Sequence, residues 1–137
     1  MKFSDQRHIE HSKESAAIYI KTFQGSENHF LAVYENDQSL VGTVTIYRNL
    51  NNDSANIGIL ISPDESGQGY ATEIFRILLA HLSVELSLYK ITAGTCELNS
   101  GMISVLEKSG MELDYRISKE YKHEGKYFDN LVYAKFF

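Results

Sequence analysis

The chain has 137 residues, which is enough for one domain with its own hydrophobic core. Its formal net charge is −5, and its Lys and Arg residues are scattered, whereas a nucleic-acid binder usually carries a basic face. No apolar run approaches the roughly 20 residues of a membrane helix, and the first residues lack the apolar stretch of a secretory signal. We therefore expect a globular cytoplasmic protein that binds neither nucleic acid nor membrane.

Cys96 is the only cysteine, and the five histidines show no metal-ligand spacing such as His-Glu-x-x-His. A single thiol excludes an intrachain disulfide, which fits a reducing cytoplasm. A lone cysteine is usually a small buried apolar residue, and Cys96 has no evident histidine partner that would activate it as a nucleophile. We expect no metal site and no covalent acyl-cysteine.

The first part of the chain predicts one helix and three strands. Residues 12–23 carry an apolar stripe at helical spacing. Two alternating runs, 30–34 and 40–47, flank a polar turn and predict a hairpin. After a second polar turn, residues 55–61 read as a third strand, antiparallel to the second.

The second part predicts a strand–helix–strand crossover and then a hairpin. Its elements are a loop at 62–69, an amphipathic helix at about 70–86, a strand at 90–98, a short helix at 99–109, and a hairpin of strands 112–122 and 127–136. Only the two strands joined by the crossover helix need to be parallel. The pattern therefore predicts an α/β (α+β) fold with a mixed, mostly antiparallel sheet, in a single domain over residues 1–137.

Two glycines, Gly67 and Gly69, stand directly before the long predicted helix. Glycine lets the backbone take positive φ and approach a ligand closely. The free N–H groups of the first helical turn point at one spot, where the helix dipole adds positive potential, so the pattern is typical of a phosphate site. The same pattern also fits a plain strand-to-helix turn that needs glycine for steric reasons.

Two other phosphate-binding motifs fit this loop poorly. The P-loop needs Gly-Lys-Ser/Thr, which is absent here. The dinucleotide motif Gly-x-Gly-x-x-Gly fails at its third glycine, where Thr72 stands, and its fold needs several parallel strand–helix units. Glu97 lies near the end of the next strand, where a ribose-binding acid would stand. Nucleotide binding therefore stays open as an alternative.

Three stretches together resemble the GNAT superfamily of N-acetyltransferases. Residues 66–71 look like its diphosphate loop, Gln/Arg-x-x-Gly-x-Gly/Ala, with Ser66 in place of the usual Gln or Arg. Residues 99–111 are similar to a later motif that begins with Asn and ends in Glu-Lys-x-Gly-Phe. Residues 125–133 resemble the last hairpin of the branch that acetylates ribosomal-protein N-termini, small amines and aminosugars.

This resemblance implies a sheet whose central parallel strands splay apart, with helices on both faces and with the family's first strand and helix missing. It implies acetyl-CoA as the acyl donor. The strand 59–61 would splay from the strand containing 95–97, and the pantetheine arm would enter the gap. A backbone N–H of Leu60 or Ile61 would bond the thioester oxygen, and Asn99 would bond the pantetheine arm or cap its helix. The diphosphate would rest on the loop and first helical turn, formed by Ser66, Gly67, Gln68, Gly69, Tyr70, Ala71 and Thr72.

The general acid and base are less well defined by the resemblance. The family's acidic tyrosine position holds Leu106, and the serine that one branch uses instead is Met102. The nearest match to a glutamate that acts through water is Glu120, although Tyr121 could occupy that register. We expect Glu120 and Asn99 to be the catalytic residues, with a solvated strand carboxylate as the alternative for Glu120.

The resemblance implies transfer of an acetyl group to a primary amine by direct attack. The acceptor would be an aminosugar, another small amine or a protein N-terminus. The alternative is a catalytically weak or inactive CoA-binding module that acts through a partner. A homodimer would cover the acceptor site and protect the exposed edge of the strand at 30–34.

Overall fold

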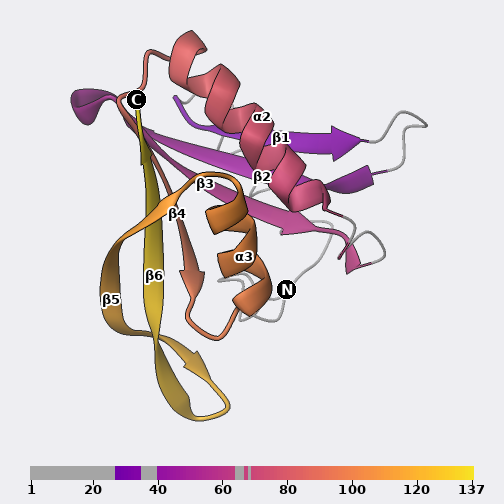
Figure 1. The fold of residues 1–137 in the computed structure, drawn as a ribbon, viewed down its shortest axis with the longest axis vertical. Coiled ribbons are helices and arrows are strands. Elements are labelled where there is room, and N and C mark those ends of the chain that lie inside the picture. The colour runs from indigo at the N-terminus through magenta and orange to yellow at the C-terminus, as the bar shows by residue number, and fades with distance from the viewer. Residues whose placement is uncertain (1–26, 35–39, 64–66, 68) are drawn as a thin grey trace.

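The computed structural model describes residues 27–34, 40–63, 67 and 69–137 (Figure 1). The helix expected at 12–23 lies outside these residues, and so does the region that bears on the expected lack of the family's first strand and helix. The described elements are β1 (His29–Tyr34), β2 (Leu40–Asn49), the 3-10 turn η2 (Leu50–Asn52), β3 (Ser54–Ile61), α2 (Tyr70–Glu85), β4 (Lys90–Cys96), α3 (Ser100–Lys108), β5 (Glu112–His123) and β6 (Lys126–Phe136). The strand and helix boundaries agree with those read from the sequence to within a few residues.

The strands form one sheet in the order β1-β2-β3-β4-β6-β5. Every neighbouring pair is antiparallel except β3 and β4, which are joined through α2 and run parallel. The predicted mixed sheet with one central parallel pair is therefore confirmed. Because α2 lies between β3 and β4 in the chain, β1 to β3 form one half of the sheet and β4 to β6 form the other (Figure 1).

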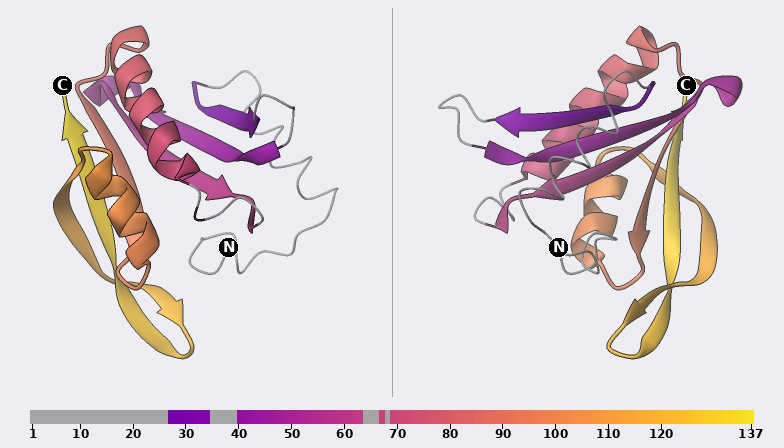
Figure 2. Two further views of the ribbon diagram at one scale, coloured as in Figure 1. Left: turned by 45° about the vertical axis from the view of Figure 1, so that its right-hand side comes forward. Right: turned by 180° about the vertical axis from the view of Figure 1, so that it is seen from behind.

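Both described helices pack on the same face of the sheet (Figure 2). Phe75 and Leu79 of α2 and Leu106 of α3 belong to one buried cluster with strand residues such as Ile57 and Ile91. These strand residues alternate with more exposed neighbours, as expected when one face of a strand is buried. The sequence analysis also expected a helix on the other face of the sheet. This expectation concerns residues 12–23, which the structure does not describe.

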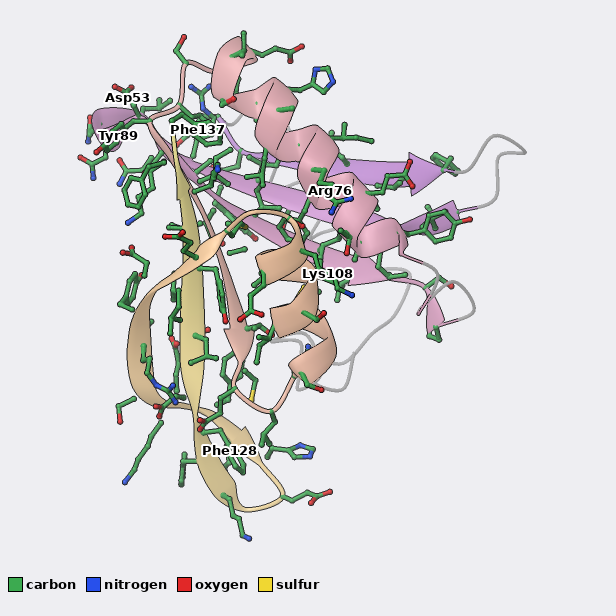
Figure 3. All side chains as sticks on the ribbon, viewed as in Figure 1. Asp53, Arg76, Tyr89, Lys108, Phe128 and Phe137 are labelled. Atoms are coloured by element: carbon green, nitrogen blue, oxygen red, sulfur yellow. The ribbon has the colours of Figure 1, made fainter. Side chains whose placement is uncertain are left out.

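A hydrogen bond ties the two helices to each other above this core. The Arg76 guanidinium of α2 donates through Nη2 to the carbonyl of Lys108, the last residue of α3, at 3.0 Å (Figure 3). Cations near a helix C-terminus are favourable because the last carbonyls lack partners within the helix. The contact fixes the end of α3 beside the first half of α2.

The chain after α3 turns sharply and returns as a hairpin. Gly110 follows α3 with φ of 87°, the left-handed conformation expected at C′. Glu124 and Gly125 form the turn between β5 and β6, with φ of 50° and 76°. Positive φ at both central residues is the geometry of a two-residue turn that matches strand twist. The terminal hairpin predicted from the sequence is thereby confirmed.

Candidate active site

The central parallel strands separate partway along their length. They pair only from Ser54 to Asn56 on β3 and from Lys90 to Thr92 on β4. Beyond this point β3 stays paired with β2, and β4 stays paired with β6. The two halves of the sheet therefore diverge between β3 and β4 (Figures 1 and 2), which confirms the splayed pair. We call the divergent stretches, 57–61 and 93–96, the opening.

The hydrogen bonds of β3 decide which of its backbone groups face the opening. Ser62, just after β3, donates its N–H to the carbonyl of Val41 at 2.7 Å. Because successive residues of an antiparallel strand point their backbone groups to opposite sides, Leu60 shares the orientation of Ser62 and faces β2. The N–H and C=O groups of Ile57, Ile59 and Ile61 consequently point toward β4, into the opening. Of the two expected oxyanion donors, Ile61 has the suitable orientation.

A side-chain hydrogen bond joins the strands at the base of the opening. Asn56 donates through Nδ2 to Thr92 Oγ1 at 2.9 Å, and these two residues are the last pair of the parallel ladder. The Thr92 hydroxyl donates in turn to the carbonyl of Ala55 at 3.5 Å. The contact therefore lies at the point where β3 and β4 part. The sequence offered no signal for it, because the two side chains come from strands that α2 separates.

The N-terminus of α2 has the backbone geometry of an anion site. Gly67 and Gly69 take φ of 80° and 81°, the left-handed region that favours glycine. The first intrahelical bond runs from Glu73 N–H to the carbonyl of Gly69, at 3.2 Å. The N–H groups of Tyr70, Ala71 and Thr72 precede it, in the first turn, where the residues four positions back lie before the helix. Ser66 and Gln68 lie outside the described residues.

Asn99 caps α3. Its Oδ1 accepts the backbone N–H of Met102 at 3.1 Å, which is the usual bond of an asparagine N-cap. Asn99 therefore has the capping role that the sequence left open as an alternative, and this role uses the oxygen of its side-chain amide. The Nδ2 group of the same amide takes no part in the cap and is the group that could bind a ligand.

The two positions of α3 at which the resemblance would place an acid hold apolar side chains that pack against the core. Leu106 is completely buried in the cluster beneath α2 and α3, and Met102 is partly buried. Tyr133 lies on the same face, where its hydroxyl donates to Glu107 Oε1 at 3.2 Å. Burial and the nearby Glu107 carboxylate raise the pKa of Tyr133, so this phenol keeps its proton at neutral pH.

Glu120 lies in a bulge of β5. Ile117 pairs with Asn130 and Tyr121 pairs with Phe128, so residues 118–120 all lie opposite the single residue Asp129. Glu120 accepts a hydrogen bond at Oε2 from Asn130 Nδ2 at 2.8 Å. Tyr121 is back in register and almost fully buried, whereas Glu120 is exposed. The bulge thus separates the two residues that the sequence left as alternatives.

Asp129 holds this bulge together. Its Oδ1 accepts the N–H of Lys119, whose φ is 54°, and its Oδ2 accepts from Arg116 Nε, both at 3.0 Å. These two hydrogen bonds lower the pKa of Asp129, and the bond from the Lys119 N–H has the larger effect. Glu97 completes the cluster by accepting from Arg116 Nη2 and from the Asp129 N–H, each at 2.9 Å. Glu97 is therefore engaged in holding β4, β5 and β6 together.

Other features of the described chain bear on the chemistry. Cys96 ends β4 and is 1% exposed, as expected for a small apolar residue. In the part of the chain that the structure describes, no three His, Cys, Asp or Glu side chains gather in a group that could hold a metal. Within the same residues, no helix is long and apolar enough to cross a membrane.

Comparisons with known proteins identify relatives of this chain. The family model described as a GNAT acetyltransferase domain matches residues 1–112. The probable N-acetyltransferase YjcK of Bacillus subtilis is 32% identical over 110 residues, which cover 79% of this chain and 61% of YjcK. The chain thus spans about three fifths of the length of that relative.

Two solved structures share the fold. Spermidine N-acetyltransferase from Vibrio cholerae, in complex with CoA and spermine, has a TM-score of 0.83 at 22% identity, covering 93% of this chain and 76% of that one. A chimera of the same enzyme, SpeG, with hSSAT has a TM-score of 0.88 at 21% identity, covering 99% and 82%. Together with the family model, which spans well over half of the residues, these findings show that the chain belongs to the GNAT acetyltransferase family.

Proposed function

We propose that this protein transfers an acetyl group from acetyl-CoA to a primary amine by direct attack. The observation that carries the proposal is the opening between β3 and β4, with the N–H groups of the first turn of α2 near its β3 side. Family membership supports the same donor. We treat residues 1–137 as one catalytic domain and propose a cytoplasmic location.

The donor would be held by backbone groups. The N–H groups of Tyr70, Ala71 and Thr72, with the loop from Ser66 to Gly69, would bind the diphosphate, because they are concentrated at the positive end of the α2 dipole. The inward-facing groups of Ile57 and Ile59 suit an extended arm with amides, which can bond a strand like an additional strand. Asn99 Nδ2 would hold the same arm.

The chemistry needs one oxyanion donor and one proton acceptor. Acetyl-CoA supplies a thioester, whose carbon accepts the amine nitrogen while the carbon–sulfur bond breaks and the CoA thiol leaves. The Ile61 N–H would stabilise the negative charge that develops on the carbonyl oxygen. Glu120 would accept the ammonium proton through water, and holding both reactants together supplies much of the rate. The leaving thiolate takes a proton from solvent, since Leu106 and Met102 carry no acidic hydrogen.

The acceptor class is a small amine, an aminosugar or a protein N-terminus. The name of the structural neighbour, spermidine N-acetyltransferase, supports the small amines. We also propose a homodimer, because β1 is an edge strand of the sheet that the described residues form, and it exposes Leu31 and Tyr34.

A CoA-binding module with little or no catalysis is the second candidate. It is favoured by the apolar residues at the two acid positions, Met102 and Leu106. Free-thiol release from acetyl-CoA with a panel of amines separates the two functions. We expect release that depends on the amine, together with a rise in melting temperature on adding acetyl-CoA but not NAD. Stabilisation by acetyl-CoA without thiol release for any amine would favour the module, and stabilisation by NAD alone would contradict both.

Asn99 has two separable roles that a pair of variants can test. Asn99→Ala removes the α3 cap and is expected to cost about 1 kcal/mol of folding free energy. Asn99→Ser keeps a capping oxygen but removes the amide, so it should keep the melting temperature and still weaken acetyl-CoA binding several-fold. Calorimetric titration and thermal melts provide both readouts. Wild-type affinity in Asn99→Ser would reduce Asn99 to a cap.

A further inference from the structure

Asn130 connects Glu120 to β4, on the half of the sheet that leaves β3. Its Nδ2 donates to Glu120 Oε2 at 2.8 Å, across the β5–β6 ladder. In the β4–β6 ladder Asn130 lies opposite Cys96, at the far end of the opening. The carboxylate is therefore linked through one side chain to the strand that forms one wall of the opening.

The other end of the same amide is in an unusual environment. Asn130 Oδ1 is buried and has no hydrogen-bond partner among the described residues. A Cβ atom at Gly94 would lie only 2.9 Å from Oδ1, closer than real contacts allow. The absence of a side chain at Gly94 is therefore what lets the amide occupy this position.

This contact lies on the sheet face away from the helices. Leu131 and Tyr133 of β6 and Ala93 of β4 belong to the core cluster beneath α2 and α3. Because side chains alternate between faces along a strand, Asn130 and Gly94 lie on the opposite face. Glu120 of β5 is thus held by Asn130 of β6, which adjoins β4, the wall of the opening.

We propose that Asn130, seated against Gly94, is a positioning residue that aims the Glu120 carboxylate at the acceptor amine. The inference deepens the proposed function and rests on it. The bulge leaves Glu120 out of the regular β5–β6 register, and Asp129 fixes the bulge backbone through Lys119. The Asn130 amide then fixes the carboxylate itself. Gly94 sets the position of the amide, so Asp129 and Asn130 of β6 and Gly94 of β4 together define where the proton acceptor on β5 lies.

The test compares kcat, KM and the pH dependence of kcat/KM for four variants. Asn130→Ala frees the carboxylate and is expected to lower kcat about tenfold with little change in KM for acetyl-CoA. Gly94→Ala should have the same effect, because its Cβ displaces Oδ1. Asp114→Ala removes another side-chain contact of β5, the 2.7 Å ion pair with Lys90, and serves as the control with wild-type kinetics.

Asn130→Asp gives a readout that a purely structural role would not change. It places a second carboxylate beside Glu120, so the acid limb of the pH profile should move to higher pH by about one unit. Other ionisable side chains of this region stay unchanged in the variant, among them Arg116 and Lys119 of β5, Asp129 of β6 and Glu97 after β4. An unmoved acid limb with normal turnover would overturn the proposal.

A double variant separates action through Glu120 from general damage. If Asn130 acts through Glu120, then adding Asn130→Ala to Glu120→Gln should cost nothing further, because the effects of residues that act as a unit are not additive. Multiplied effects, or a lowered melting temperature that accounts for the loss in Asn130→Ala, would reduce Asn130 to a structural residue. Wild-type protein that releases no thiol with any amine overturns the proposed function itself, and this inference with it.

Discussion

Replacing Gly69 with glutamate is expected to raise the dissociation constant for acetyl-CoA by about 100-fold, equivalent to about 2.7 kcal/mol. Gly69 has φ of 81°, a left-handed conformation that costs a residue with a side chain about 1–2 kcal/mol. The new carboxylate would also repel the diphosphate at the N-terminus of α2, where like charges about 4 Å apart are worth several kcal/mol. Calorimetric titration of acetyl-CoA measures the change.

Gly125→Glu is the matched control for this variant. Gly125 also has positive φ, 76°, and an added Cβ would meet no atom within 4 Å at either glycine. Gly125 lies in the turn of the terminal hairpin, away from α2. Both variants should melt at lower temperature than the wild type, but only Gly69→Glu should lose acetyl-CoA. Unchanged affinity in Gly69→Glu would show that the loop does not bind the diphosphate.

Glu120→Gln is expected to lower kcat by about 100-fold, within the range for removal of a general base. Only the ionised carboxylate accepts a proton, so wild-type activity should fall along an acid limb at low pH. Glutamine cannot ionise, so this acid limb should disappear. The limb that reports deprotonation of the amine acceptor remains in both proteins.

A second glutamate of β5 provides the control for that experiment. Glu112 is exposed and begins the strand, eight residues before Glu120. Glu112→Gln makes the same chemical change on the same strand and should keep wild-type kcat and pH profile. If Glu120→Gln behaves like Glu112→Gln, then Glu120 is a solvated strand carboxylate, the alternative that the sequence left open.

Local sequence patterns predicted the elements and their order. The alternation over residues 40–47 indicates a strand with one buried face, and the periodicity over residues 70–86 indicates a helix with one buried face. The structure buries both faces in the core cluster. Asn99 and Gly110 predicted the two ends of α3 because capping depends on residues next to the helix. The divergence of β3 and β4 came instead from the family resemblance, since no local pattern encodes where two strands part.

Cross-strand contacts account for what the sequence did not predict. The β5 bulge depends on Asp129, whose carboxylate binds the Lys119 N–H from another strand. The Asn130 amide is held by Glu120 and by the space at Gly94, which come from two different strands. Single-sequence reasoning describes neighbours along the chain, whereas these contacts depend on which residues the ladders bring opposite each other.

A crystal structure of the protein with CoA tests the central claim most directly. The account predicts diphosphate oxygens within hydrogen-bond distance of the N–H groups of Tyr70, Ala71 and Thr72, with the pantetheine amides bonded to β3 inside the opening. A ladder that closes β3 onto β4 beyond Asn56 and Thr92, with the diphosphate bound away from α2, would contradict it.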